Sequence, residues 1–232
     1  MVVQRVESRR AAAPNGLSGD MYQSLIVVDD FYARPMEVRR FALGCDYPAG
    51  LGQLTFPGRN STQSFLPPGL DQVISSLAGE PLVGCGRPNV AHGRFRITLN
   101  GEPSRYLVHA DPSYLTWVAV VYLNPVDHIG GGTTFYRHRD LQSDRVPSEA
   151  VLHTCGVASV AELLQRDGKD PGKWEHLMTV PQRFNRLVLY RPWLWHSAGE
   201  SFGTSLDDGR LVHLLFFEPG GRPGAPAREP GP

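Results

Sequence analysis

The sequence has few cysteines, no net charge and no long apolar run, and each of these shortages excludes a class of protein. Its three cysteines, Cys45, Cys85 and Cys155, are far apart and odd in number, which indicates neither a disulfide framework nor a zinc clip. The 23 basic and 23 acidic residues cancel, so no global field attracts the chain to nucleic acid or to an anionic membrane. No segment approaches the roughly 20 apolar residues of a membrane span, and no signal-peptide core is present. These absences predict a cytoplasmic protein.

The length of 232 residues suits one hydrophobic core better than two. We expect a single domain over residues 21–218. Residues 1–20 are small, polar and basic and are predicted to be mobile, whereas residues 219–232 are rich in glycine and proline and are predicted to be disordered. Residues 137–180 combine a basic stretch, a helix-like piece and a polar stretch, which predicts an insertion or lid over a sheet.

The apolar pattern favours strands over helices. Residues 94–100 alternate basic and apolar side chains, so they predict a half-buried strand with Arg96 on its polar face. That face either lines the mouth of a barrel, making Arg96 a substrate or cosubstrate contact, or faces water. Residues 115–123 form the longest β-branched and aromatic run and predict a central strand, with Trp117 and Tyr122 on opposite faces. Glycine turns between such runs favour an antiparallel sandwich.

Two segments have helical periodicity and are expected to pack on the outside of the sheets. The first begins near Pro35 and ends at Gly44, and its charged residues, Arg39 among them, are expected to face water. The second covers residues 67–79 and carries an apolar stripe that includes Val73. Both are predicted to be scaffold.

A histidine and an aspartate two residues apart form the most informative motif. Side chains two apart in an extended strand point the same way, so His109 and Asp111 can bind one ion. His196 directly follows the apolar run at residues 187–190, which places a second imidazole at a strand end. Two histidines and one carboxylate hold a non-haem ferrous ion on one face and leave the other face open. The spacing alone is weak evidence, because H-x-D also occurs by chance.

The neighbouring motifs make the pattern specific. Besides the H-x-D pair they are Y-L-N at 122–124, G-G-x-T-x-F at 130–135, the distal His196 and the basic Arg210. Over residues 94–217 this order resembles the 2-oxoglutarate and iron(II)-dependent oxygenases, nearest the prolyl 4-hydroxylase-like branch. The chain is also similar to bacterial proteins of unassigned function that share the D-D-F-Y segment at 29–32 and N-R-L at 185–187.

The resemblance implies a mainly β fold with flanking helices, a double-stranded β-helix of the jelly-roll or cupin-like kind. It implies that iron(II) is bound by His109, Asp111 and His196 as the catalytic centre, with 2-oxoglutarate and dioxygen as cosubstrates. A basic residue after the distal histidine would bind the far carboxylate of 2-oxoglutarate, which makes Arg210 the candidate, with Tyr122 adding a hydrogen bond.

One departure from the family concerns the spacing of the distal histidine and its arginine. His196 and Arg210 are 14 positions apart (210 − 196), more than is usual in the family, and the segment 199–209 would absorb the difference. Arg186 and Arg191 are therefore kept as alternative carboxylate anchors, although a structural ion pair is the simpler role for both.

The resemblance says little about the substrate, which is expected to be a small molecule, an amino acid or a group carried on a peptide or carrier protein. Candidate substrate contacts are Arg96, Arg59 in a predicted loop over 47–65, Trp117, Thr133 and Trp195. Related halogenases have Ala or Gly in place of the ligand Asp111, which leaves a position on the iron for chloride; because Asp111 is present here, hydroxylation is favoured over chlorination. The alternatives are a cupin-like metal-binding barrel without oxygenase activity, or the same oxidant used for desaturation, cyclisation or epimerisation. A monomer or homodimer is expected.

Overall fold

The computed structural model describes residues 22–48, 57–126 and 131–221. The mobile segment expected at residues 1–20 lies outside the described residues, and so does most of the tail expected to be disordered. Pro219 is described and pairs with Leu82 at the end of the last strand, so this strand extends past the predicted boundary at residue 218. Within the described residues, no helix is both long enough and apolar enough to cross a membrane.

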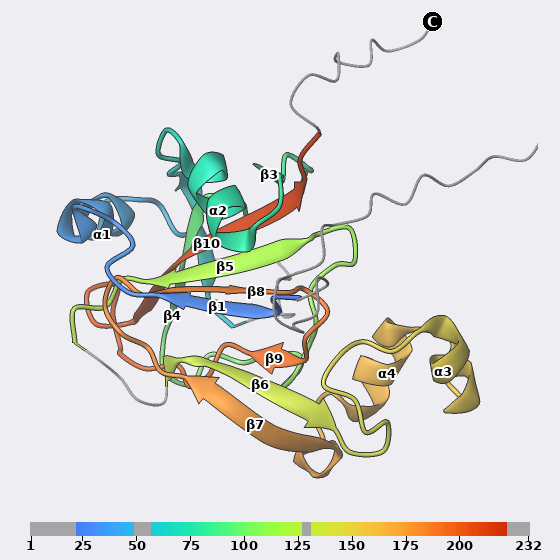
Figure 1. The fold of residues 1–232 in the computed structure, drawn as a ribbon. Coiled ribbons are helices and arrows are strands. Elements are labelled where there is room, and N and C mark those ends of the chain that lie inside the picture. The colour runs from blue at the N-terminus through green and yellow to red at the C-terminus, as the bar shows by residue number, and fades with distance from the viewer. Residues whose placement is uncertain (1–21, 49–56, 127–130, 222–232) are drawn as a thin grey trace, which may run out of the picture.

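Two antiparallel sheets lie face to face, as Figure 1 shows. The larger sheet has the order β1-β8-β5-β10-β4-β2, with β3 paired to β10, and the smaller has the order β7-β6-β9. In chain order the strands are β1 (Leu25–Val28), β2 (Arg59–Ser64), β3 (Leu82–Gly84), β4 (Arg94–Thr98), β5 (Trp117–Tyr122), β6 (Thr133–His138), β7 (Trp174–Val180), β8 (Leu187–Tyr190), β9 (His196–Ser197) and β10 (Arg210–Pro219). The predicted mainly β, antiparallel architecture is confirmed.

Strand β5 is central, because all of its residues are buried and it lies between β8 and β10. Its side chains alternate as predicted. Trp117 packs in the core on the outer face, beneath the helices α1 (Pro35–Leu43) and α2 (Leu70–Ala78), whereas Tyr122 belongs to the core between the two sheets. The period of two therefore separates a scaffold core from the face that carries the site.

The two helices are present where they were expected, but two predicted orientations are wrong. Arg39 is buried rather than in water, and its guanidinium donates to the carbonyls of Leu123 at 3.0 Å and Asp207 at 2.6 Å. These two carbonyls replace water as hydrogen-bond acceptors for the guanidinium group, so its charge is tolerated in the interior. In α2, Val73 of the predicted stripe is 48% exposed, because the buried face of the helix is formed by Leu70, Ile74 and Ala78, with Leu77 packed at its side.

The predicted loop over 47–65 is partly a strand. β2 pairs with β4 through Arg59 opposite Ile97, with an irregular register between Asn60 and Ser64. Every side chain of β2 is polar, so the alternation of apolar and polar residues that marks a half-buried strand is missing. A polar strand of this kind is suited to the edge of a sheet, where β2 lies.

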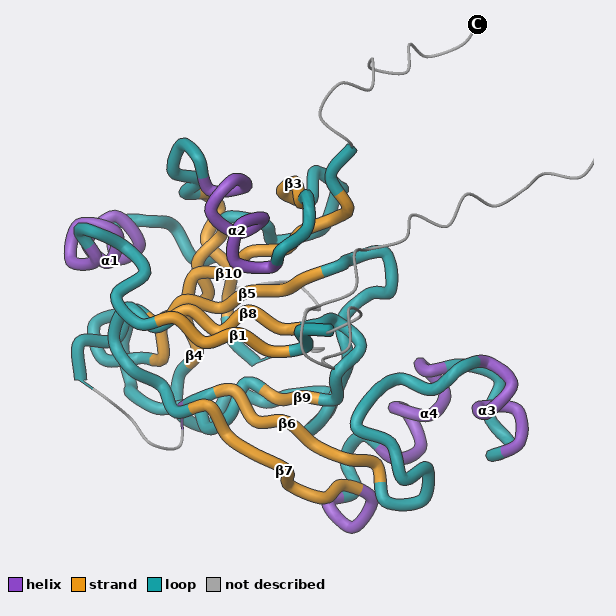
Figure 2. The backbone as a smooth tube through the Cα atoms, viewed as in Figure 1, coloured by secondary structure: helices purple, strands orange, loops and turns teal. Residues whose placement is uncertain are grey.

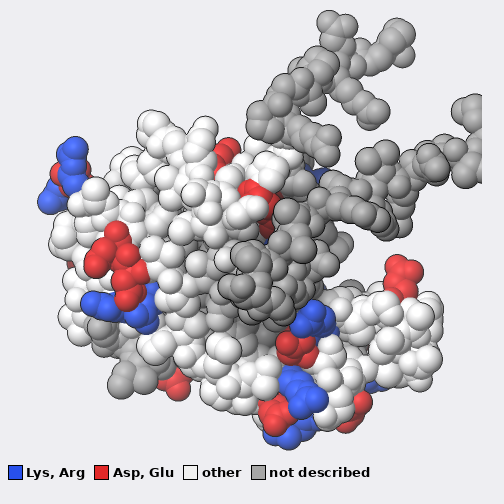
Figure 3. Space-filling model, in the orientation of Figure 1, with Lys and Arg blue, Asp and Glu red and all other residues white. Residues whose placement is uncertain are grey.

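The insertion is shorter than the predicted 137–180, because β6 and β7 are both part of the smaller sheet. Between them lie α3 (Glu149–Thr154), α4 (Val160–Asp167) and a 3-10 turn, η3 (Pro171–Lys173), and Figure 1 shows α3 and α4 beside one end of the two sheets. His138, at the end of β6, is fully buried, with its Nε2 atom 3.0 Å from Asp167 Oδ2. This pair ties the insertion to the sheet. On the face drawn in Figure 3, basic and acidic groups are intermixed, in keeping with the zero net charge.

The fully buried His213 makes the stability of the fold sensitive to pH. Its Nδ1 atom is hydrogen-bonded to the Tyr32 hydroxyl at 2.6 Å, and its ring stacks on Phe95 at 4.6 Å. Burial lowers the pKa of His213 to about 4 from its ordinary 6.5. Between pH 6.5 and 4 the unfolded chain binds a proton that the folded chain does not. The contribution of His213 to the free energy of unfolding is therefore fully present above pH 6.5 and is lost as the pH drops toward 4.

We expect His213 to account for up to about 3 kcal/mol of this loss. Denaturant unfolding between pH 4 and 8 tests it. The pH slope of His213→Phe should be shallower than that of the parent, while His153→Gln, at an exposed position, should keep the parent slope. Equal slopes for the parent and His213→Phe would show that His213 does not titrate with folding.

Candidate metal centre

The two histidines and the aspartate of the sequence motif come together between the sheets. One ligand atom from each of His109, Asp111 and His196 lies within 4.8 Å of the other two. The backbones of His109 and His196 exchange two hydrogen bonds of 2.9 Å, and the imidazole centroids are 4.2 Å apart. In the described part of the chain, this is the one group of histidine, cysteine or acidic side chains with such spacing.

The predicted strand through His109 and Asp111 is wrong. His109 forms only an isolated bridge with His196, and both ligands lie in the long loop that joins β4 to β5, drawn as a tube in Figure 2. Asp111 is held by a hydrogen bond from its amide to the Pro192 carbonyl at 2.8 Å. Pro112 and Pro192 have no N–H to donate, so the ladder cannot continue beyond this point.

The tautomer of His196 suits a metal ligand. Its Nδ1 atom is 2.8 Å from the carbonyl of Leu194, which can only accept, so Nδ1 carries the proton and Nε2 presents its lone pair. That Nε2 atom lies 3.3 Å from Oδ2 of Asp111, a buried oxygen that has no hydrogen-bond partner. Two electron-rich atoms directed at one point are costly without a cation, so the donor set fits a divalent metal ion.

The electrostatics of the site agree with this. Burial, reinforced by His196, lowers the pKa of His109 to about 3, so its ring is neutral at physiological pH. Burial opposes ionisation of Asp111, but the two histidines and Arg96 outweigh it and lower the pKa of the carboxyl group. Neutral imidazoles and an anionic carboxylate are the forms that bind a divalent cation. The Tyr190 hydroxyl lies 3.2 Å from His196 Nε2, beside the ligand atoms.

The candidate centre opens into a cavity of about 760 Å³ between the sheets. Arg210, at the start of β10, lines this cavity and is buried, and its Nε atom donates to the Gly131 carbonyl at 2.8 Å. The guanidinium carbon is 5.7 Å from the centre of the Tyr122 ring. The Tyr122 hydroxyl is hydrogen-bonded to Thr133 Oγ1 at 2.6 Å. The cavity that contains the three candidate ligands therefore also carries a fixed positive charge.

Comparison with known families gives one decisive match. Residues 14–217 match a family that is described as a family of unknown function (DUF6445). The chain belongs to the DUF6445 family. A comparison with curated proteins gave no match.

Three solved structures are similar to this DUF6445 protein over most of its length. SnoK, a non-heme alpha-ketoglutarate-dependent carbocyclase from nogalamycin biosynthesis, has 16% sequence identity and a TM-score of 0.50, over 85% of this chain and 80% of that one. HygX from Streptomyces hygroscopicus, with nickel and 2-oxoglutarate bound, has 13% identity and a TM-score of 0.49, over 84% and 83%. A prolyl hydroxylase from Trichoplax adhaerens, in complex with a peptide, has 13% identity and a TM-score of 0.48, over 84% of each chain. The likeness to SnoK supports the double-stranded β-helix fold predicted from the sequence.

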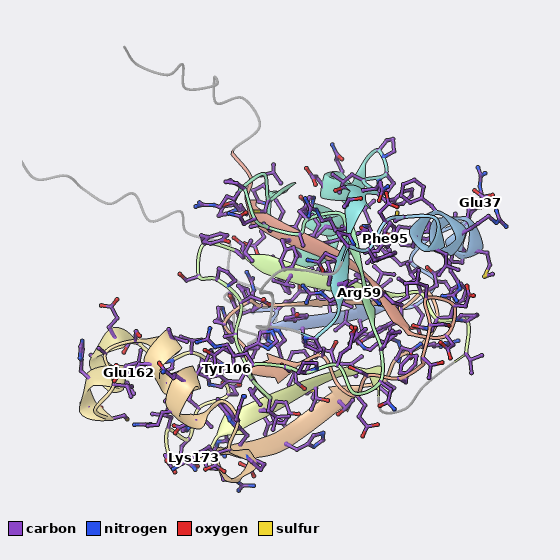
Figure 4. The ribbon with its side chains drawn as sticks, turned by 180° about the vertical axis from the view of Figure 1, so that it is seen from behind. Glu37, Arg59, Phe95, Tyr106, Glu162 and Lys173 are labelled. Carbon is purple, nitrogen blue, oxygen red and sulfur yellow. The ribbon has the colours of Figure 1, made fainter. Side chains whose placement is uncertain are left out.

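The structure brings some predicted site residues of the DUF6445 protein to the cavity and leaves others out. Arg96 and Thr133 line it, whereas Arg59, Trp117 and Trp195 do not. Figure 4 shows Arg59 at the larger sheet, where its Nε atom lies 3.9 Å from Glu102. The prediction that these three side chains contact the substrate in this cavity is therefore wrong.

The two tryptophans point away from the cavity for different reasons. Trp117 points to the outer face of β5, where its Nε1 atom donates to Glu80 at 2.6 Å. Trp195 precedes His196 and packs on Trp174 at 5.3 Å in the core beneath the insertion, because neighbouring residues of an extended segment point to opposite sides.

The alternative carboxylate anchors do not reach the cavity either. Arg186 is paired with Asp29 at 2.7 Å, and Arg191 is paired with Glu80 at 2.8 Å, as expected for structural ion pairs. Tyr122 does not line the cavity itself and contacts its wall through Thr133.

Sequence reasoning missed several cavity residues of the DUF6445 protein, notably Tyr106, Tyr136 and Tyr190. Tyr106 lies in the ligand loop (Figure 4), and no pattern in the sequence indicates its direction. Tyr136 could have been predicted from the sequence, because it lies two residues after Thr134 in β6 and side chains two apart in a strand share a face.

Proposed function

We propose that this protein is an iron(II)- and 2-oxoglutarate-dependent oxygenase that hydroxylates an unactivated C–H bond of a small molecule, an amino acid or a group carried on a peptide or carrier protein. The observation that supports it best is the pairing of two features in one cavity. Three ligand atoms converge within 4.8 Å, and the buried Arg210 lines the same cavity. A metal site alone needs no such arginine.

His109, Asp111 and His196 would hold iron(II), the metal that a facial set of two histidines and one carboxylate suits. When bound, iron and 2-oxoglutarate would supply the oxygen activation, with conversion of 2-oxoglutarate to succinate and carbon dioxide. The Leu194 carbonyl orients the His196 ring, and the backbone exchange between the two histidines fixes their separation. The chain thus prepares the ligand geometry before any ion binds.

Arg210 would bind the carboxylate of 2-oxoglutarate that is distant from the metal. Its guanidinium is aligned by the Gly131 carbonyl, and among the described residues no carboxylate is paired with it. A planar guanidinium can donate two parallel hydrogen bonds to a carboxylate, and a buried guanidinium does so with little competition from water. Thr133, held by the Tyr122 hydroxyl, offers a further hydroxyl at the same wall.

The rival function is a cupin-like metal-binding barrel without oxygenase activity. Burial of the Arg210 guanidinium without a paired carboxylate destabilises the fold, and a barrel that only binds a metal ion gains nothing from this arginine. Desaturation and cyclisation use the same cofactors, so they share the residue roles given above and differ only in what happens to the substrate.

Formation of succinate tests this function. The iron-loaded protein, supplied with 2-oxoglutarate and air, should form succinate slowly even without its substrate. Asp111→Ala should reduce that rate by orders of magnitude, because the ion loses a ligand. If the fully iron-loaded parent forms no more succinate than free iron does, the metal-binding barrel without oxygenase activity is favoured.

A further inference from the structure

The hydroxyl group of Tyr190 lies beside the candidate metal centre but is not one of its three candidate ligands. Tyr190 is the last residue of β8, and it pairs with Leu25 of β1 on one side and with Val118 of β5 on the other. Its backbone is therefore held by both neighbouring strands. The side chain is buried and lines the same cavity as the ligands, with its hydroxyl oxygen 3.2 Å from Nε2 of His196.

One short segment connects Tyr190 to two of the candidate ligands. Residues 191–195 lead from Tyr190 to His196, and the rings of these two residues are in edge contact at 4.7 Å. The Pro192 carbonyl in the same segment accepts a hydrogen bond from the Asp111 amide at 2.8 Å. The hydroxyl, the imidazole and the carboxylate therefore depend on one piece of backbone for their relative positions.

The Tyr190 hydroxyl is a donor in this position. Nδ1 of His196 donates to the Leu194 carbonyl, so Nε2 has a lone pair and the hydroxyl supplies the proton of their contact. A metal ion bound at Nε2 uses that lone pair, and the hydroxyl then needs another acceptor. Asp111 Oδ2 lies 3.3 Å from the same Nε2 atom and has no hydrogen-bond partner among the described residues. Burial raises the pKa of Tyr190, and the nearby charge of Asp111 raises it further.

Packing alone does not account for the hydroxyl group. The Tyr190 ring belongs to the core between the two sheets, where it meets the Phe135 ring edge-on at 5.5 Å. A phenylalanine at position 190 would fill the same space. A buried hydroxyl is stable only with a hydrogen-bond partner, and here the neighbouring acceptors belong to candidate metal ligands.

We propose that the Tyr190 hydroxyl donates a hydrogen bond to the Asp111 carboxylate when a metal ion is bound, which makes Tyr190 a positioning residue of the metal centre. The inference rests on the metal centre of the proposed function. A hydrogen bond to a ligating carboxylate holds it in one orientation, and the loss of such an outer contact typically lowers metal affinity by about 10- to 100-fold. Tyr190 thus acts on the metal ion through Asp111.

Titration of nickel(II) into the parent and into Tyr190→Phe tests this role. The variant loses one oxygen atom and keeps the ring, so it should fold and should bind nickel(II) about 10- to 100-fold more weakly. The visible absorption bands of the cobalt(II)-loaded protein, which respond to ligand orientation, should shift as well. Tyr136→Phe is the matched control, because this cavity tyrosine is hydrogen-bonded to Ser197 at 3.2 Å. Its nickel affinity and cobalt spectrum should equal those of the parent.

A double-mutant cycle with Asp111→Ala separates an effect through Asp111 from a general effect on the site. The two histidines of Asp111→Ala should still bind nickel(II), since imidazole suits this ion. Adding Tyr190→Phe to Asp111→Ala should then lower the affinity no further. A Tyr190→Phe protein with parental nickel affinity overturns the inference, and so does an equal loss in the Asp111→Ala background, while both leave the oxygenase function in place. Failure of the parent to bind nickel(II) contradicts the proposed function itself.

Discussion

His196→Ala should lose stoichiometric iron binding and reduce succinate formation by orders of magnitude, while the fold remains intact. The side chain supplies the Nε2 atom that lies 3.3 Å from Asp111 Oδ2, so its removal leaves the ion with two protein ligands. The ring lines the cavity and contacts the Tyr190 ring at 4.7 Å, so its removal should cost some stability but leave the chain folded. Iron content after dialysis, succinate formation and thermal unfolding measure the three quantities.

A matched control is available at the same cavity. His176 also lines it but is exposed and belongs to no candidate ligand group among the described residues. Iron content in His176→Ala should equal that of the parent. Full iron binding and succinate formation in His196→Ala would refute the proposed triad.

Arg210→Gln should weaken 2-oxoglutarate binding by about 30-fold to several thousand-fold, which corresponds to the roughly 2–5 kcal/mol lost with a buried charge-assisted pair. Iron affinity should be nearly unchanged, because the guanidinium contacts the Gly131 carbonyl and the cavity, and no metal ligand. Anaerobic titration of 2-oxoglutarate into iron-loaded protein measures the first quantity, and iron content measures the second.

Arg186→Gln is the control for a generic loss of positive charge. Its partner Asp29 lies at the surface, so we expect an unchanged affinity for 2-oxoglutarate and at most a small loss of stability. If Arg210→Gln binds 2-oxoglutarate as tightly as the parent, the anchor has been assigned to the wrong residue. The spacing of 14 positions from His196 would then mark a true departure from the 2-oxoglutarate oxygenase pattern that the sequence resembles.

Sequence patterns predicted those parts of this molecule that depend on a short period. Alternation along β4 and β5 correctly separated Phe95 and Trp117 from Arg96 and Tyr122, because successive side chains of a strand point to opposite faces. The three residues that meet at the candidate metal centre were identified from their chemistry together with the neighbouring motifs and the resemblance that those motifs carry, because H-x-D alone also occurs by chance.

Features that depend on tertiary context were not predictable. Nothing local indicates that Arg39 meets two carbonyls from distant segments, or that an all-polar segment at Arg59 pairs with β4 as an edge strand. The strand expected at His109 was reduced to a single bridge by prolines on both segments, one of which is 80 residues away in sequence (192 − 112). Pairing partners of this kind become visible only in the folded chain.

The most direct test of the central claim is the visible absorption of the iron-loaded parent protein when 2-oxoglutarate is added without oxygen. If both bind at the triad as proposed, a charge-transfer band should appear and saturate at one equivalent of 2-oxoglutarate per iron. It should be absent in Asp111→Ala at the same iron concentration. A parent that binds iron at the triad but shows no band and no heat of binding at saturating 2-oxoglutarate would contradict the account.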